Sequence, residues 1–383
     1  MSRPGILIAG GGLVGTALAC AVRGFDVQLV EAAAARAAPS GDYDVRVYAL
    51  SAGTRAFLRA IGAWERLDAD RVAPVARMEV RAPGGACLSF DAPARASLAW
   101  IVEAGRLAAA LESRAEELAP VSILRGVAAE SFGASAAGGW IGLADGRRLE
   151  ASLLVGADGA DSAVRAALGM KAQVRAYGET AFVANFDTER THDGVARQWF
   201  RVDGVLAWLP LPGRRMSIVW SAREPLAAEL AALEGGEFTK RVREAGGSAL
   251  GELALISRVA RFPLRLVRVA DPVAPGAALV GDAAHAVHPL AGQGVNLGFQ
   301  DARGLAEALD TRSPLERPGD LRVLRRYARG RRADVDAMQF VTDRLDRAFA
   351  GERPGAAALA NLGLSLVDAV PWAKRSLAAR AMR

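Results

Sequence analysis

The segment PGILIAGGGLVG at the start of the chain constrains the fold more than any other. Residues 6–8 form an apolar run that is typical of a strand buried on both faces of a parallel sheet. Gly10, Gly12 and Gly15 follow with the spacing G-x-G-x-x-G, and an apolar stretch of helical character covers residues 13–22. This order of strand, glycine turn and helix predicts the first half of a βαβ unit.

The second strand of that unit, FDVQLV, ends in Glu31. Glycines in such a turn let the backbone approach a pyrophosphate, and the free N–H groups of the helix N-terminus bind that anion. A carboxylate at the end of the second strand accepts hydrogen bonds from a ribose. We therefore predict a dinucleotide site, for NAD or FAD, and keep a glycine turn in another kind of α/β domain as the alternative.

Two later segments carry an aspartate at the end of an apolar strand. LLVGADGADSAVRAALG leads into Asp158 and then into a helix that is expected to begin near Ser162 and to carry Arg165. The strand AALVG leads in the same way to Asp282. Ligands of open parallel sheets bind beyond the carboxyl ends of the strands, so we expect both aspartates to face the glycine turn.

A third glycine-rich stretch follows Asp282. Gly292, Gln293 and Gly294 lead into Val295 and Asn296 at the start of an expected helix. The N-terminus of this helix would direct its partial positive charge at an anion that forms nearby.

Length and composition narrow the class of protein. A chain of 383 residues exceeds one core, so two or three compact units are expected. The residues are 51% hydrophobic and 23% charged, as in soluble globular proteins, and no apolar run approaches a membrane span. The net charge of +6 comes from arginines scattered along the chain, which argues against a nucleic-acid partner. Two cysteines and no recognisable signal segment favour a reducing cytoplasm.

Together, these motifs resemble those of the flavoprotein aromatic hydroxylases. The G-x-G-x-x-G near residue 10, the central ADG with its following Ser and Arg, and the late GDAAH occur in that order. The loop HPLAGQG followed by NLG is similar to that of the ubiquinone-biosynthesis hydroxylases within that family. Shorter stretches of the same group, such as ALS after Arg46, AWLPLPG, SIVW and RFPL, extend the resemblance over nearly the whole chain.

The resemblance implies roles for individual residues around FAD. The ADP half would be held by the first glycines and Glu31, the ribityl chain by Asp282, and the pyrimidine edge of the flavin by Gly292, Gly294, Val295 and Asn296. Backbone N–H groups of Val295 and Asn296 would stabilise charge on the flavin, which makes them the candidate catalytic groups. Asp158 would act around FAD and the nicotinamide. Arg46 and Arg106 are interpreted as contacts to the cofactor's anionic part, with plain surface arginines as the alternative.

The implied fold is a Rossmann-like FAD-binding domain with an inserted, mostly β-sheet substrate domain and a C-terminal helical segment. We expect FAD-binding parts at 1–71, 97–176 and 268–340, substrate-domain strands at 72–96, a substrate-binding sheet at 177–267 and a helical region at 341–383. Alternating short runs between Tyr177 and Leu266 predict that sheet independently. Its aromatic residues would line an apolar cavity or form ordinary sheet core: Trp199, Phe200, Trp208 and Trp220.

The implied reaction is the hydroxylation of an aromatic ring through a flavin hydroperoxide, with O2 as co-substrate. NAD(P)H or a separate donor would supply the electrons, and the substrate would be a polyprenyl phenol or benzoquinol intermediate of ubiquinone biosynthesis. The alternatives are a hydroxylase of a soluble aromatic compound and, in another class, a non-catalytic flavin-bound assembly subunit. Contacts with other ubiquinone-biosynthesis proteins and a homodimer stay open.

Two further features leave alternatives. His285 and His288 lack the glutamate and the third ligand of a zinc site, so we expect them to hydrogen-bond the backbone of the flavin loop. In the alternative, one of them tunes the flavin or carries its protons. The apolar C-terminal tail, with a basic end after Pro371, fits either a peripheral contact with the inner face of the membrane or a helix docked on the FAD domain.

The chain departs from the pattern of the ubiquinone group at two places. Glu103 is followed by Ala104 where the group usually has Glu-Asn, and Glu179 adds a carboxylate within the segment from Tyr177 to Ala181. These changes bear on the substrate and on the ring position that is hydroxylated, and not on the flavin.

Overall fold

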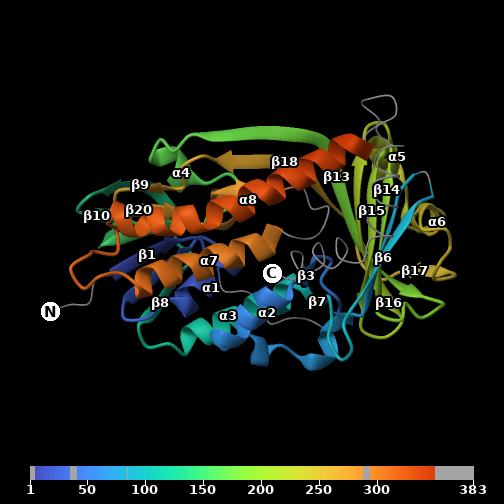
Figure 1. The fold of residues 1–383 in the computed structure, drawn as a ribbon, viewed down its shortest axis with the longest axis horizontal. Coiled ribbons are helices and arrows are strands. Elements are labelled where there is room, and N and C mark those ends of the chain that lie inside the picture. The colour runs from blue at the N-terminus through green and yellow to red at the C-terminus, as the bar shows by residue number, and fades with distance from the viewer. Residues whose placement is uncertain (1–4, 35–40, 84, 288–293, 350–383) are drawn as a thin grey trace.

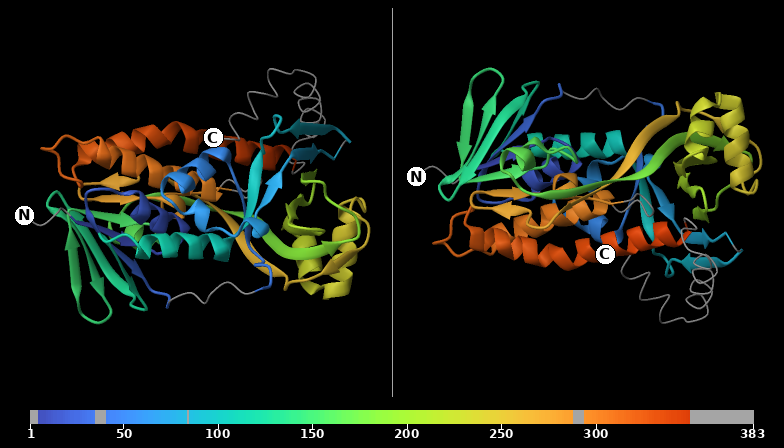
Figure 2. Two further views of the ribbon diagram at one scale, coloured as in Figure 1. Left: turned by 90° about the horizontal axis from the view of Figure 1, so that it is seen from below. Right: turned by 90° about the horizontal axis from the view of Figure 1, so that it is seen from above.

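The structure is a computed structural model that describes residues 5–34, 41–83, 85–287 and 294–349. It has two halves, which lie side by side along the long axis of the molecule (Figure 1). One half is built around a parallel sheet, and the other around a large, mostly antiparallel sheet. The long strands β13 (Ala172–Thr188) and β18 (Ala260–Val269) run from one half into the other (Figures 1 and 2).

The first half contains a six-stranded sheet in the order β19-β20-β12-β1-β2-β8. All pairs are parallel except β19 with β20. The strand bounds are β1 Gly5–Ala9, β2 Asp26–Glu31, β8 Val121–Arg125, β12 Leu153–Gly156, β19 Val273–Ala274 and β20 Ala277–Leu279. In β1, Ile6 and Ile8 belong to one hydrophobic core while Leu7 and Ala9 belong to another, which explains why the strand is a continuous apolar run.

Helices cover one face of this sheet and a small antiparallel sheet covers the other (Figures 1 and 2). The helices are α1 Leu13–Ala21, α2 Ala52–Ala60, α3 Ala104–Glu116, α7 Gly294–Asp310 and α8 Leu321–Phe349. The small sheet consists of β9 Ala129–Ser135, β10 Gly138–Leu143 and β11 Arg148–Ala151, and it lies beside the short helix α4 Ala163–Ala167. Because both faces of the parallel sheet are covered, a ligand can bind only at one of its edges.

The second half is a sheet in the order β21-β18-β13-β16-β15-β14-β5-β6, with β17 also paired to β13. Its other strands are β5 Arg77–Arg81, β6 Cys87–Asp91, β14 Val195–Arg201, β15 Gly204–Leu211, β16 Arg215–Arg223, β17 Leu253–Leu255 and β21 His285–Ala286. Helices α5 Leu226–Ala232 and α6 Gly235–Ala245 cover one face. This architecture confirms the fold class expected from the sequence, a Rossmann-like domain with an inserted, mostly β-sheet domain.

The cavity interpretation of the sheet aromatics is wrong for the two central tryptophans. Trp208 and Trp220 are fully buried in the core between the sheet and helices α5 and α6, and Trp199 packs edge-on against Trp208. Alternate residues of a strand face opposite sides of a sheet. Trp208 and Trp220 face the side covered by α5 and α6, away from the half that contains the glycine turn. Phe200 packs in a separate core with residues of β5 and β6, such as Val80.

A three-stranded sheet, β3-β7-β4, lies between the two halves. Its bounds are β3 Val47–Leu50, β4 Ala73–Val75 and β7 Ala99–Glu103, and short 3-10 turns occur at Trp64–Arg66, Ala69–Arg71 and Gly281–Ala283. Val47 and Ile101 of this sheet pack against Ala196 and Leu211 of the large sheet. The β3-β7-β4 sheet therefore fixes the position of Arg46, which directly precedes β3, relative to both halves.

Candidate functional site

The predicted site residues come together at the carboxyl edge of the parallel sheet. Strands β20, β12 and β1 are direct neighbours, and their carboxyl ends lead into Asp282, Asp158 and Gly10 respectively. A Cβ added to Gly10 would lie only 2.9 Å from Cα of Asp158, so these two segments are in contact. The order of the strands thus joins three motifs that lie far apart in the sequence.

The three motif glycines have different reasons to be glycine. Gly10 has a φ of +105°, which side chains with a Cβ rarely adopt. A Cβ on Gly15 would lie 2.0 Å from the carbonyl oxygen of Gly10, so only glycine lets helix α1 pack this close to β1. A Cβ on Gly12 would meet no protein atom within 4 Å. Gly12 therefore borders open space directly before the first turn of α1, where a pyrophosphate would bind.

Glu31 is held in place by two backbone N–H groups, one in the glycine turn and one just beyond the end of β2. Its Oε2 accepts a hydrogen bond from the N–H of Gly11 at 2.7 Å, and its Oε1 accepts one from the N–H of Ala33 at 2.9 Å. An ionised carboxylate has about four acceptor positions, so both oxygens can still accept from ligand hydroxyls. The side chain is positioned in advance beside the glycine turn.

Asp158 has one satisfied and one unsatisfied oxygen. Its Oδ2 accepts from the N–H of Val164 at the start of α4, at 3.1 Å, while its Oδ1 is buried without a hydrogen-bond partner in the described part of the chain. A buried acceptor without a donor is costly, and a ligand hydroxyl would supply the donor. Arg165 donates to the carbonyl oxygens of Ala160 at 2.8 Å and Ala283 at 2.9 Å, which ties this segment to the Asp282 turn.

Asp282 lies in the turn Gly281–Ala283, where Gly281 has a φ of +61°. The side chain is exposed, yet the protein around it removes enough hydration to raise its pKa. The positive charges of His285, Arg265 and Arg46 oppose that rise. An exposed carboxylate at the carboxyl end of β20 is suited to accept hydrogen bonds from ligand hydroxyls.

Helix α7 begins at Gly294, and its first turn is fastened to β3. The Asn296 side chain is buried, its Nδ2 donates to the carbonyl oxygen of Ala49 at 2.8 Å, and its Oδ1 accepts from the N–H of Ser51 at 3.0 Å. The backbone N–H groups of Val295 and Asn296 belong to the first helical turn, which has no intrahelical acceptors. The predicted Gly292 and His288 lie outside the described residues.

These features fit FAD or another dinucleotide: a glycine turn with open space, a fixed carboxylate for a ribose, an unsatisfied Asp158 oxygen and a second carboxylate at Asp282. Comparison with known proteins decides between the dinucleotides. The model of the family described as FAD binding domain matches residues 4–340. The chain belongs to this FAD-binding family.

The relatives narrow the assignment within the family. The chain is 34% identical to ubiquinone hydroxylase UbiL of Rhodospirillum rubrum, with 98% of this chain and 89% of that protein covered. It is 33% identical to 3-demethoxyubiquinol 3-hydroxylase of Escherichia coli, with 97% and 96% covered. The FAD-binding chain is thus a flavoprotein monooxygenase of the ubiquinone-hydroxylase group, which confirms the resemblance seen in the sequence.

Solved structures agree with the family's fold. The p-nitrophenol 4-monooxygenase PnpA of Pseudomonas putida DLL-E4 superposes with a TM-score of 0.79 at 19% identity, covering 100% of this chain and 99% of that one. At this identity the likeness concerns the fold alone.

In this FAD-binding protein, Arg46 and Tyr48 lie close enough to Asp282 to interact with it electrostatically. The Arg46 guanidinium is exposed and lies 4.9 Å from the ring centroid of Phe262. Burial raises the pKa of the Tyr48 phenol, partly opposed by Arg46, and the charge of Asp282 raises it further. No sequence pattern indicated a role for Tyr48 other than its position next to the Arg46 motif.

Arg106 has protein partners. Its Nε lies 3.1 Å from Oε2 of the buried Glu103, and its Nη1 lies 4.0 Å from Asp68. Glu103 also accepts from Arg71 at 2.8 Å and from the backbone N–H of Asp44 at 2.7 Å. Glu103 thereby anchors the segment that leads to Arg46, while a cofactor contact of Arg106 stays a prediction.

The other unusual acidic residue, Glu179, forms an ion pair within the large sheet. It lies opposite Arg223 in the register of β13 and β16, and the two side chains approach to 2.7 Å. Glu179 lies where the register of β13 with β18 shifts, between Ala176 and Thr180.

His285 differs from the expectation that it bonds the backbone of the loop. It is buried, and its Nε2 lies 2.5 Å from Oδ2 of Asp301 on helix α7. Asp301 also binds Arg331 of helix α8, at 2.8 Å. Neither contact could be anticipated, because no local pattern pairs His285 with residues on helices α7 and α8.

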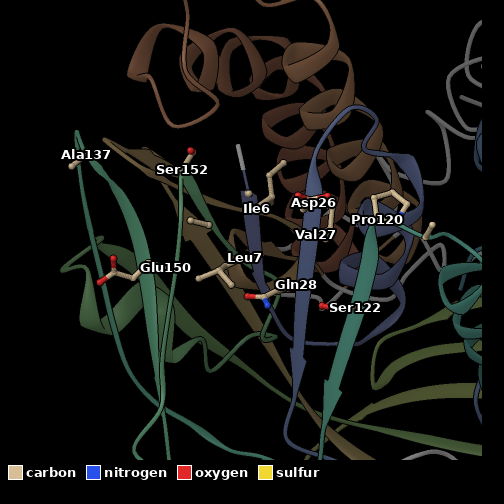
Figure 3. A pocket seen from close by; sticks show the side chains of 13 residues that line it. Ile6, Leu7, Asp26, Val27, Gln28, Pro120, Ser122, Ala137, Glu150 and Ser152 are labelled. Carbon is tan, nitrogen blue, oxygen red and sulfur yellow. The ribbon is translucent and has the colours of Figure 1, made fainter. Parts of the chain in front are cut away.

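A hollow of about 820 Å³ lies at the opposite edge of the parallel sheet. Figure 3 shows its lining residues, among them Ile6, Asp26 and Ser122, at the amino ends of β1, β2 and β8. Ligands of such sheets bind at the carboxyl ends, so this hollow is distinct from the predicted FAD site.

Proposed function

We propose that this monooxygenase hydroxylates the aromatic ring of a polyprenyl phenol or benzoquinol on the route to ubiquinone. The observation that carries the proposal is the identity of about one third, over nearly the full length, to proteins named as ubiquinone and 3-demethoxyubiquinol hydroxylases. The matches cover 98% and 97% of this chain, so they include the predicted cofactor motifs as well as the stretches outside them.

We propose the following roles for the chain's own residues. The first glycines and Glu31 bind the ADP half of FAD, Asp158 and Asp282 bind its hydroxyls, and Arg46 contacts its anionic part. FAD supplies the activation of dioxygen after reduction by NAD(P)H or by a separate donor. The N–H groups of Val295 and Asn296 would stabilise negative charge on the pyrimidine edge of a bound flavin. The side chain of Asn296 holds these groups in register with β3.

A phenol substrate activates its own ring, so the reaction depends on orientation and on the exclusion of water more than on a strong base. Arg46 directly precedes the β3-β7-β4 sheet, which packs against the large sheet through apolar residues such as Val47 and Ile101. We propose that the substrate ring binds between these sheets and the flavin.

The test is the quinone profile of a strain that lacks this gene. We expect its lipid extract to contain a prenylated intermediate that lacks one oxygen, and its substitution pattern, obtained by mass spectrometry, identifies the ring carbon. Normal ubiquinone after deletion of this gene together with the other flavin hydroxylase candidates would contradict the proposal and favour a soluble aromatic substrate.

We also propose that the C-terminal tail provides a peripheral contact with the cytoplasmic face of the membrane. None of the helices in the described part of the chain is long and apolar enough to cross a membrane. The tail lies outside the described residues, and the proposal depends on its apolar sequence and its basic end, which suit an anionic surface.

Truncation after Val370 is expected to abolish co-sedimentation with vesicles that contain anionic phospholipid. The FAD spectrum of the truncated protein, unchanged from that of the full chain, serves as the control for folding. Equal sedimentation of the truncated and full-length proteins would rule out the membrane contact.

A further inference from the structure

Three charged side chains form a buried ion cluster behind the FAD-binding turn: His285, Asp301 and Arg331. Asp301 is fully buried on α7, and each of its oxygens has a cationic partner. Oδ2 lies 2.5 Å from Nε2 of His285, and Oδ1 accepts from Nε of Arg331 at 2.8 Å. Oδ2 also accepts from the backbone N–H of Gly281 at 3.0 Å. Asp301 thus holds the residue that directly precedes Asp282.

The contacts determine the charge of the ion cluster. Burial alone lowers the pKa of His285, but the adjacent Asp301 carboxylate outweighs it and leaves that pKa raised. Burial alone raises the pKa of Asp301, but His285 and Arg331 leave it lowered. The cluster therefore consists of two cations and one anion, with a net charge of +1. Asp334, the other partner of Arg331, is an exposed residue, so solvent screens its charge.

The ion cluster lies close to the proposed flavin position. Asp301 is five residues beyond Asn296 on α7, a rise of about 7.5 Å along the helix. His285 lies three residues beyond Asp282, and their charges interact. A net charge this close to Asn296, inside a protein, is screened far less than the same charge in water.

We propose that Asp301 is a positioning residue for the turn that binds FAD, and that the protonated His285 it holds supplies buried positive charge favouring the reduced flavin. The inference depends on FAD binding and not on the identity of the substrate. Its test is therefore independent of the lipid analysis above.

Two variants separate the two roles. His285→Gln removes one cation, so the net charge of the cluster falls from +1 to zero while Asp301 still binds the N–H of Gly281. Asp301→Asn removes the anion and lets His285 lose its proton, so the net charge stays at +1. An amide has one acceptor oxygen in place of two, so it cannot serve Gly281, His285 and Arg331 together.

We expect H285Q to lower the midpoint potential of the bound flavin, with FAD affinity within about threefold of that of the unaltered protein. D301N should weaken FAD binding about tenfold, the effect of one hydrogen bond, with a smaller shift in potential. FAD affinity is measured by fluorescence titration of the apoprotein, and the potential by equilibration with a reference dye. Thermal unfolding of each apoprotein shows whether it folds, and H285N replaces H285Q if that variant does not.

Tyr327→Phe is the matched control. The Tyr327 hydroxyl donates to the carbonyl oxygen of Leu279 at 2.8 Å, in the strand that leads to Asp282, but carries no charge. Y327F should leave the potential unchanged. An unchanged potential in H285Q would overturn the electrostatic role of His285, and unchanged FAD affinity in D301N would overturn the positioning role of Asp301.

The pH dependence gives a second readout. The difference in potential between the unaltered protein and H285Q should be largest at low pH and disappear as the pH rises through the raised pKa of His285. The charged groups that face His285 are Asp282, Asp301 and Arg331, with Arg268 opposite it in the β18 register. A difference that does not change with pH would contradict a protonated His285.

Discussion

Replacing Gly15 by alanine is expected to abolish FAD binding and to lower the free energy of unfolding by about 3 kcal/mol. The new Cβ would lie 2.0 Å from the carbonyl oxygen of Gly10 and 3.1 Å from Cβ of Ala157. The carbonyl belongs to the backbone and cannot rotate away, so β1 and α1 must separate. Chemical denaturation of the apoprotein and FAD titration measure the two effects.

Gly12→Ala is the matched comparison, because it adds the same methyl group to the same turn. Its Cβ meets no protein atom within 4 Å, so the apoprotein should fold with nearly unchanged stability. The methyl group would occupy the space proposed for the pyrophosphate, and we expect FAD affinity to fall about 100-fold, as for an overlap of a few kcal/mol. If G12A binds FAD normally, the pyrophosphate does not lie at this turn.

Asp282→Ala is the second change with a large expected effect. It removes the carboxylate proposed to bind the ribityl hydroxyls, and the loss of two charge-assisted hydrogen bonds predicts FAD binding at least about 100-fold weaker. FAD content after purification and titration of the apoprotein measure this loss. Asp271→Ala removes an exposed carboxylate in the loop before β19 and should bind FAD normally.

The pH dependence of binding follows from the raised pKa of Asp282. Ligand hydroxyls donate to the ionised carboxylate, so FAD affinity should fall as the pH drops through that pKa, at a less acidic pH than for an ordinary aspartate. Asp282→Asn should bind weakly at every pH and lack this step.

The Asp282→Ala variant also distinguishes an enzyme from an assembly subunit. A monooxygenase that loses FAD cannot restore ubiquinone to the deletion strain, so D282A should fail to complement it. A non-catalytic subunit that tolerates the loss of flavin would still support quinone synthesis. Complementation by D282A, with normal protein levels in the cell, would therefore contradict catalysis.

Local sequence patterns predicted much of the fold and indicated the segments that we propose to bind the cofactor. The glycine turn at Gly10–Gly15 and the strands before Asp158 and Asp282 depend on residues that are neighbours in the sequence. Their periodicity and turn chemistry are therefore visible without a structure. The resemblance to known hydroxylases added the flavin, which the glycine motif alone did not distinguish from NAD.

Hydrogen-bond partners that lie far apart in the sequence were determined by the tertiary structure. Asn296 bonds to Ala49, 247 residues away, and Glu103 anchors the segment before Arg46 across 59 residues. The order of strands and the packing of helices create such contacts, and no local pattern encodes them.

The sequence by itself predicted a dinucleotide site at three strand ends, because each strand end carries its own local signal. Only the tertiary structure decided what lies behind that site. The tertiary structure places Trp208 and Trp220 in the core beneath α5 and α6, since the face of a strand that becomes buried depends on what packs against it. It also gave His285 the carboxylate of Asp301 as its partner, since the ionic surroundings of a buried group are set by helices from elsewhere in the chain.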